Sequence, residues 1–341
     1  VQTGAAPAVL EPYANQGLFN WLICMALCTV LSLVLPPAKP EQVTDELAFN
    51  WKTLNLGGGL GGPWYKGVPF WSGLSIVMMF GFVILFSVVL YMARRNIRSN
   101  AAPRPPMGWN SWDCFGVDVT EEEVKANAAL MAERLRPVGW EYIVVDLAWY
   151  GDGLTARGEQ YKMERPPQLI DRWGRLIPNI SLHPSAADGA GFKPLADHLH
   201  SLGLKFGIHI MRGVPWQAVE AKSPIKGTSY TCDEIALDKE RCHWYKGMYS
   251  IDMTHPGGQA YYDSLGELYA SWDVDFVKAD DMNSWTDEET SPYRVDEVEG
   301  ISRALQRSGR PMVLSLSPGG ARLAQAAHLQ RHAHMWRLSP D

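Results

Sequence analysis

The sequence predicts an α/β protein in which an incomplete (β/α)8 barrel of about six βα units follows two transmembrane helices. From residue 107 onward, short apolar runs that end in polar residues alternate with helix-forming segments, a pattern typical of a parallel sheet. Most charged residues of the 341 lie after position 93, whereas the first hundred residues contain two long uncharged apolar runs. The two regions are therefore expected to occupy different environments.

Residues 1–98 are predicted to form the membrane segment. The apolar runs at about 18–35 and 68–92 carry no charged side chain. Even the shorter run would extend about 27 Å as a helix, which is enough to cross a bilayer core. Arginines follow the second run closely, so the positive-inside rule predicts that the chain after it, and with it the barrel, is cytoplasmic. The region thus predicts a multi-pass membrane location with two spans, and two buried helices of a soluble protein are the alternative.

The stretch PPAKPEQVTDELAFNWKTLNLGGGLGGPWYKGVPFWSG lies within this region. With its flanks, over residues 10–92, it resembles the C-terminal tail of a sodium:solute symporter. Such transporters bind their substrate among many helices, some of them broken, and two unbroken helices cannot build that site. The resemblance therefore implies a remnant or fusion partner. One alternative for the whole chain is a non-catalytic membrane fragment of a symporter joined to an incomplete barrel.

Residues 99–106 are predicted to be a linker, and residues 107–341 a partial barrel. Six strand candidates follow one another, at 107–113, 141–149, 204–212, 275–281, 311–317 and 334–341. Polar residues recur at the carboxyl ends of these candidates, where (β/α)8 enzymes carry their active sites. Six strands leave a barrel two short of closure, and an open doubly wound sheet is the structural alternative.

Helix signals separate the strand candidates. Thr120 followed by Glu123 is a capping box, and apolar residues then recur at helical spacing. Two further helices are predicted to end at Gly203 and at Gly309, because glycine readily adopts the left-handed conformation that closes a helix. These helices would link successive parallel strands.

The fourth strand candidate brings charged residues into an apolar run, VDFVKADDM. Alternation along the strand places Lys278 and Asp280 on one face and Asp281 on the other. In a barrel the first face points into the lumen, and a carboxylate beside an ammonium stays ionised, so Asp280 is a candidate nucleophile. A buried ion pair without chemistry is one alternative. A Schiff-base lyase in which Lys278 is the nucleophile is the other.

The motifs PPMGWNSWDCFG, EYIVVDLAWY, GFKPLADHLHSLGLKFGIH, YYDSLGELYASWDVDFVKADD and MWRLSPD occur in this order. With them, residues 103–341 resemble the N-terminal part of the catalytic barrel of glycoside hydrolase family 27, the family of α-galactosidases. The resemblance implies a retaining glycosidase that cleaves terminal α-galactosyl or related pyranosyl residues by double displacement. It implies Asp280 as the nucleophile and Asp341 as the acid/base, with carboxyl groups about 5 to 5.5 Å apart. The substrate-binding residues that it implies are Trp109, Asp146, Trp149, His209, Lys278 and Arg337.

The sequence departs from the family pattern at several positions. Asp146 is followed by Leu147, where α-galactosidases usually carry a second aspartate that binds the distal hydroxyls of the sugar. Ser315 and Ser317 occupy the region of a usual glutamate, and His209 replaces a common tyrosine. Galactose is therefore the default of the family, and arabinopyranose or an α-glucoside stays open.

The remaining expectations concern partners and cofactors. The resemblance implies a carbohydrate substrate, and the sequence predicts no cofactor and no metal. The net charge of −6 without a basic stripe argues against a nucleic-acid partner. The N-terminal helices would add the membrane as a partner, and the sequence gives no indication of the oligomeric state.

Overall fold

The computed structural model describes residues 80–81, 101–151, 163–237, 242, 245–282, 292–317 and 320–339. The chain divides into two units, residues 1–89 and residues 90–341. Nearly all described residues belong to the second unit. The predicted spans at 18–35 and 68–92 lie outside the described residues, apart from Phe80 and Gly81. The predicted linker at 99–106 stays a prediction.

The described part of the chain contradicts the predicted membrane location. A helix needs about 20 consecutive apolar residues to cross a bilayer. Among the described residues, no helix reaches that length with sufficient apolar character. The longest of them, α7 (Pro256–Ser271), has 16 residues and includes Asp263 and Glu267. The predicted multi-pass location, with its cytoplasmic barrel, is therefore wrong on this finding, and the described residues do not support the membrane as a partner.

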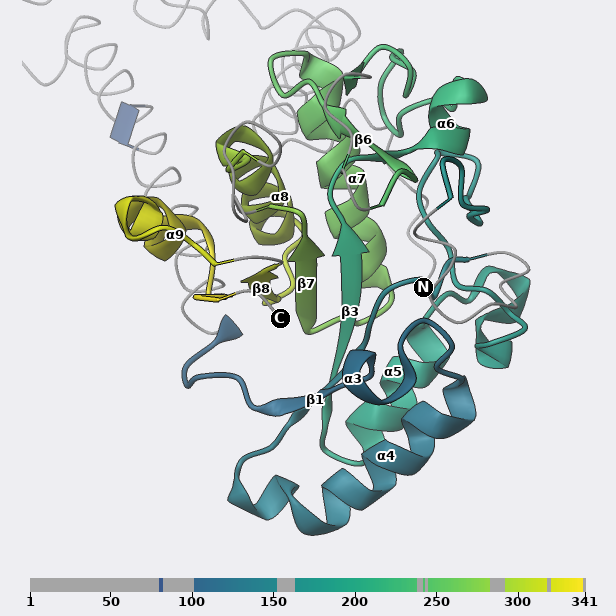
Figure 1. The fold of residues 1–341 in the computed structure, drawn as a ribbon, viewed down its shortest axis with the longest axis vertical. Helices are drawn as coiled ribbons and strands as arrows, with labels where there is room; N and C mark the ends of the chain where they lie inside the picture. The colour runs from purple at the N-terminus through teal and green to yellow at the C-terminus, as the bar shows by residue number, and fades with distance from the viewer. Residues whose placement is uncertain are drawn as a thin grey trace, which may run out of the picture. The chain divides into compact units, whose positions relative to one another are not determined.

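Six parallel strands form one curled sheet in the order β1-β2-β3-β7-β8-β9, with β3 and β7 side by side at its centre (Figure 1). Each strand lies within one of the six predicted segments, which fits an incomplete (β/α)8 barrel. The strands are β1 (Gly108–Asn110), β2 (Tyr142–Val145), β3 (Lys205–Met211), β7 (Phe276–Asp280), β8 (Val313–Leu316) and β9 (Met335–Trp336).

Helices connect the strands as the sequence predicts. The capping box of Thr120 and Glu123 begins α4, and Gly203 and Gly309 follow α5 and α8 with φ of 73° and 80°. The remaining α-helices are α3 (Trp112–Phe115), α4 (Glu121–Arg134), α5 (Lys193–Ser201), α6 (Trp216–Glu220), α8 (Val295–Arg307) and α9 (Ala326–His332). Short 3-10 helices lie at η4 (Arg136–Val138), η6 (Pro184–Gly189) and η8 (Leu323–Gln325).

The two faces of the sheet bury different apolar clusters. Val277 and Ala279 of β7 belong to the large core that packs against the helices. Phe276, which precedes Val277 and points to the opposite face, instead joins a small cluster with Tyr142, Val144, Val313 and Ala101. The small cluster therefore marks the lumen side of the curled sheet. This confirms the predicted alternation, because Lys278 and Asp280 share the face of Phe276.

A small antiparallel sheet lies between β3 and α7 along the chain, and the sequence analysis missed it. Its order is β4-β6-β5, with β4 (Val214–Pro215), β5 (Ala236–Leu237) and β6 (Met248–Ile251). Strands of two to four residues are too short to give a clear periodic signal in the sequence. Figure 1 shows β6 and α6 above the arrowheads of β3 and β7. The insertion thus lies at the carboxyl ends of the central strands.

Candidate active site

Asp146 follows β2 and connects three strands. Its side chain is 1% exposed. The Oδ2 atom accepts hydrogen bonds from Nζ of Lys278 at 2.8 Å and from Nδ2 of Asn110 at 2.6 Å. Its Oδ1 atom accepts the backbone N–H of Leu147 at 2.8 Å. The carboxylate is therefore buried with donors on both oxygens, as a buried charge requires.

The surroundings of Asp146 keep it ionised. Burial opposes the ionisation of this carboxyl, but the charges of His209 and Lys278 and the hydrogen bonds from Lys278 and Leu147 outweigh that effect. Together they lower the pKa of Asp146 to about 2. The group is thus a fixed negative charge at neutral pH.

This lowered pKa predicts an acid-dependent loss of stability. Because the folded-state pKa lies below the unfolded value of about 3.9, Asp146 stabilises the fold above about pH 4. The contribution, roughly 2 kcal/mol, is lost as the pH falls toward 2. Urea unfolding between pH 6 and pH 2.5 measures it. The difference between the native chain and Asp146→Asn should shrink over that range, whereas Asp188→Asn, at an exposed aspartate, should show no such trend. A constant difference for Asp146→Asn would contradict the assignment.

Asp280 ends β7 and is held from two sides. It is 6% exposed. Nε2 of His209 lies 2.8 Å from Oδ2, and the backbone N–H of Asp281 donates to Oδ1 at 2.8 Å. A ring nitrogen at this distance from a carboxylate oxygen donates its proton, so both carboxylate oxygens are oriented. The sequence analysis expected Lys278 to hold Asp280, but the ion pair of Lys278 is with Asp146 and the contact of Asp280 is with His209.

A buried charge network lies directly behind Asp280. Arg212 is 1% exposed, and its Nε donates to Oδ2 of Asp281 at 2.6 Å while its Nη1 donates to Oε1 of Glu297 at 3.1 Å. Tyr262 donates its hydroxyl to the other oxygen of Glu297 at 2.6 Å. Asp281 adopts a φ of 60°, which is uncommon for a residue other than glycine. The network therefore fixes the residue whose N–H orients Asp280.

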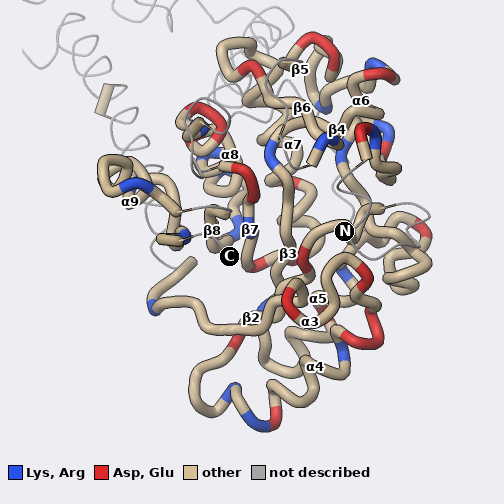
Figure 2. The backbone as a smooth tube through the Cα atoms, viewed as in Figure 1, with Lys and Arg blue, Asp and Glu red and all other residues tan. Residues whose placement is uncertain are grey.

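The sequence analysis missed this network and also Asn110. The signal was present in the second aspartate of KADD and in the arginine that follows the strand IHIM. Figure 2 shows acidic and basic segments of the chain near the carboxyl ends of β3 and β7, where these groups lie. Charged residues that follow two neighbouring parallel strands are brought to one edge of the sheet, and this rule would have found Arg212.

Trp109 and Trp149, two of the predicted substrate-binding residues, face the core. Trp109 is in register with the fully buried Ile143, on the opposite face of the sheet from Asn110. Trp149 is 1% exposed, and its indole N–H donates to the backbone carbonyl of His209 at 2.7 Å. Its ring also packs edge-on against Phe192 at 5.2 Å. Trp149 thereby helps to position His209, and the substrate-binding role of both tryptophans stays a prediction.

The remaining predicted site residues are Arg337, His209 and Asp341, and the structure describes the first two. Nη1 of Arg337 donates to the hydroxyl of Ser317 at 3.4 Å, at the β8 side of the sheet. Nδ1 of the buried His209 finds no hydrogen-bond partner among the described residues. Asp341 lies outside the described residues. Its separation from Asp280 stays a prediction.

Comparisons with known proteins connect this geometry to a family. No protein-family model matches the chain. The α-galactosidase of Cyamopsis tetragonoloba is 28% identical over 232 residues, which are 67% of this chain and 42% of that protein. Alpha-galactosidase A of Cellvibrio japonicus is 28% identical over 243 residues, which are 70% of this chain and 44% of that protein. The chain thus spans somewhat less than half the length of these curated relatives.

A solved structure is more similar. It is a β-L-arabinopyranosidase of glycoside hydrolase family 27 from Geobacillus stearothermophilus, in complex with arabinose. That protein is 48% identical with a TM-score of 0.68, over 72% of this chain and 55% of that one. The comparisons do not show the predicted resemblance of residues 10–92 to a symporter. The barrel part of this chain is thus similar to α-galactosidases and to a β-L-arabinopyranosidase of glycoside hydrolase family 27.

Proposed function

We propose that the protein is a retaining glycoside hydrolase that removes terminal α-galactosyl or related pyranosyl residues. The observation that carries this proposal is Asp280, a buried carboxylate at the carboxyl end of a central strand with hydrogen-bond donors on both oxygens. This is the end of a (β/α)8 sheet where active sites lie. The curated relatives, which are α-galactosidases, support the same activity.

In the proposed mechanism, Asp280 attacks the anomeric carbon and forms a glycosyl ester while Asp341 protonates the leaving oxygen. Asp341 then accepts a proton from water, which attacks the ester and releases the sugar with retained configuration. The hydrogen bonds from His209 and from the N–H of Asp281 hold the attacking carboxylate in one orientation. Such positioning lowers the barrier because little reorganisation is needed during the reaction.

The ion pair of Asp146 and Lys278 supports substrate binding in this scheme. Both side chains extend from the carboxyl half of the sheet and meet at 2.8 Å. Asp146 is ionised at neutral pH because its pKa is lowered to about 2. A carboxylate of this kind accepts hydrogen bonds from sugar hydroxyls. We assign Asp146, Lys278 and His209 to the substrate-facing wall.

Two sugars fit the positions at which this sequence differs from the α-galactosidase pattern. The α-galactopyranosyl and β-L-arabinopyranosyl groups share the orientation of their ring hydroxyls, and the second lacks the hydroxymethyl group. Leu147 is buried in the large core and carries no polar group where α-galactosidases usually carry a second aspartate. The solved arabinopyranosidase at 48% identity agrees with the smaller sugar. We therefore propose β-L-arabinopyranosyl groups as the second candidate substrate.

Covalent labelling tests the proposed nucleophile. A form of the protein that contains all eight barrel units is incubated with an activated fluorosugar of the galactopyranosyl or arabinopyranosyl series. Because the fluorine slows release of the sugar, a glycosyl ester should accumulate on Asp280 and appear in the mass of its peptide. Borohydride trapping of a carbonyl substrate on Lys278, without a label on Asp280, would favour the Schiff-base alternative instead.

A further inference from the structure

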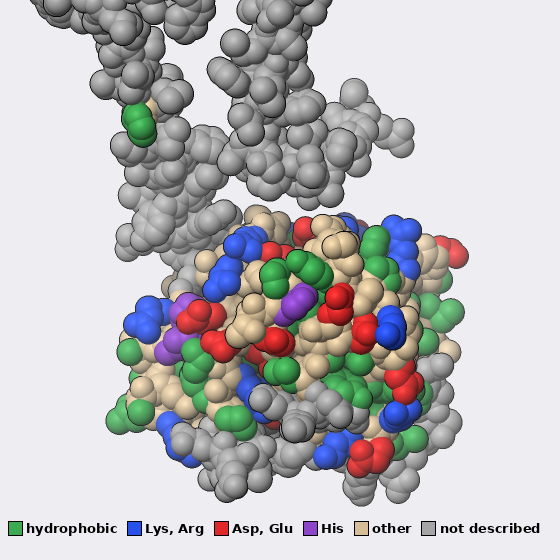
Figure 3. Space-filling view, turned by 90° about the horizontal axis from the view of Figure 1, so that it is seen from above, with side chains coloured by type: hydrophobic (Ala, Val, Ile, Leu, Met, Phe, Trp, Pro, Cys, Tyr) green, Lys and Arg blue, Asp and Glu red, His purple; other side chains and the backbone are tan. Residues whose placement is uncertain are grey.

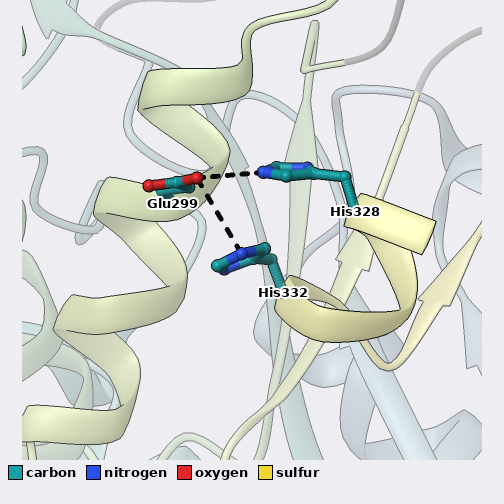
Figure 4. Close-up of side chains that lie close together, drawn as sticks. All are labelled: Glu299, His328 and His332. Carbon is teal, nitrogen blue, oxygen red and sulfur yellow. Dashed lines mark hydrogen bonds and ion pairs between the residues drawn. The ribbon is translucent and has the colours of Figure 1, made fainter. Parts of the chain in front are cut away.

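Three side chains that can ligate a metal converge between α8 and α9. Figure 4 shows Glu299 on α8 facing His328 and His332, which lie one turn apart on α9. Nε2 of His328 lies 3.2 Å from Oε1 of Glu299, and Nε2 of His332 lies 3.9 Å from the same oxygen. The two imidazole rings stack with their centroids 4.4 Å apart. Each of the three residues offers a ligand atom, and these atoms all lie within 4.8 Å of one another.

We propose that Glu299, His328 and His332 bind a divalent transition-metal ion, with Zn²⁺ as the best match. Zn²⁺ favours imidazole nitrogen and carboxylate oxygen at about 2.0 to 2.2 Å in a tetrahedral arrangement. Such bond lengths place neighbouring ligand atoms roughly 3.3 Å apart. The contact of His328 with Glu299 already has that separation, and small side-chain rotations bring His332 to it. Histidines at i and i+4 on one helix face form this kind of ligand pair.

The surroundings suit a ligand set. The hydroxyl oxygen of Tyr293 lies 2.6 Å from Nδ1 of His328. When that oxygen accepts the Nδ1 proton, Nε2 keeps its lone pair for the metal, which is the usual orienting contact of a ligating histidine. Arg303 lies 3.6 Å from Oε2 of Glu299, the oxygen away from the histidines. One carboxylate oxygen is thus neutralised by an arginine while the other faces both imidazoles.

Without a metal, the same side chains can form a purely structural hydrogen-bond arrangement. Tyr293 would donate its proton to Nδ1 of His328, and Nε2–H would donate to Glu299. Burial, with the nearby charge of Glu299, raises the pKa of Tyr293 to about 12, so the phenol holds its proton at neutral pH in either arrangement. The two states differ in the position of one imidazole proton, which the metal displaces from Nε2. Metal binding therefore moves this proton to Nδ1 without releasing it, and binding weakens at acidic pH because a doubly protonated imidazole has no lone pair for the metal.

Solvent can reach the cluster. The side chains of His328, His332 and Glu299 are 16%, 25% and 37% exposed. Figure 3 shows histidine side chains beside acidic ones at the left margin of the described part, on the side where α9 lies in Figure 1. A bound ion would join α9 to α8, next to the last two strands of the sheet. The ion would thereby stabilise that edge of the fold.

The test uses the full chain, freed of metal with a chelator and titrated with Zn²⁺ alone. The native chain should bind one more Zn²⁺ than the double variant His328→Gln/His332→Gln. At a Zn²⁺ concentration about a hundred times the dissociation constant, its unfolding midpoint should rise by about 5 to 10 °C, and the double variant should lose most of that rise. Cobalt(II) in place of zinc should give a visible spectrum in the native chain that the double variant lacks.

Two further variants keep the result unambiguous. Glu299→Gln keeps the size of the side chain and should weaken Zn²⁺ binding at least tenfold, because it removes the anionic ligand. His198→Gln, on α5, should leave binding unchanged. Zn²⁺ held elsewhere, for example by cysteines, is the same in all four proteins and cancels in the comparison. Equal stoichiometry and equal midpoint shifts in the native chain and the double variant, or no response of the native chain, would overturn the proposal. None of these measurements depends on glycosidase activity.

Discussion

Asp280→Ala is expected to remove glycosidase turnover almost completely, with kcat/KM falling by at least about 10³-fold. The reason is chemical: Asp146, the neighbouring buried carboxylate, is held by Lys278 and Asn110 and therefore does not replace Asp280 in forming the covalent ester. The measurement is hydrolysis of nitrophenyl α-galactopyranoside and nitrophenyl β-L-arabinopyranoside by a form of the protein with all eight barrel units. Asp263→Ala, on the outer helix α7, is the matched control and should stay within about twofold.

Chemical rescue makes this prediction sharper. Removal of the Asp280 carboxylate leaves space for a small anion beside the anomeric carbon. Azide or formate should therefore restore part of the turnover of Asp280→Ala, and the azide product should have the inverted configuration, since one displacement replaces two. Retention in that product, or full activity of Asp280→Ala without any anion, would contradict the nucleophile assignment.

The strand pattern made much of this site predictable. Alternation in VDFVKADDM put Lys278 and Asp280 on one face, and the two apolar clusters confirm it. The choice of partners was not predictable from that strand alone. The partners depend on the register of neighbouring strands, which places His209 of β3 directly opposite Lys278 of β7. Lys278 then reaches Asp146 after β2, and Asp280 reaches His209 on β3. Sequence periodicity gives the face of a side chain, but its partner follows only from the order and stagger of the strands.

Trp109, Trp149 and the histidines of α9 show the same limit. Trp109 and Trp149 were assigned by the order of motifs, whereas the register turns Trp109 toward the helices and burial encloses Trp149. The sequence analysis predicted no metal and did not consider His328 and His332 as a pair. His328 and His332 carry the i, i+4 spacing that would have raised the question. Glu299 becomes their neighbour only when α8 and α9 pack together.

Arg212→Ala is expected to cost the fold about 3 to 5 kcal/mol. The truncation would leave Asp281 and Glu297 buried without the guanidinium that holds both of them. Burial opposes the charge on Arg212, but these two carboxylates outweigh that effect and raise its pKa, so the fold depends on the full charge. Urea unfolding at pH 7 gives the loss directly. Arg303→Ala, half-exposed on α8, is the control and should change stability by at most about 0.5 kcal/mol.

Arg212→Lys separates charge from geometry in the same network. A lysine restores a cation but lacks the planar fork that donates to Asp281 through Nε and to Glu297 through Nη1. Its loss of stability should therefore fall between those of the native chain and Arg212→Ala. A loss below about 1 kcal/mol for Arg212→Ala would show that water or rearrangement compensates the two carboxylates. In that case the backbone of Asp281 would not depend on Arg212, and neither would the N–H that orients Asp280.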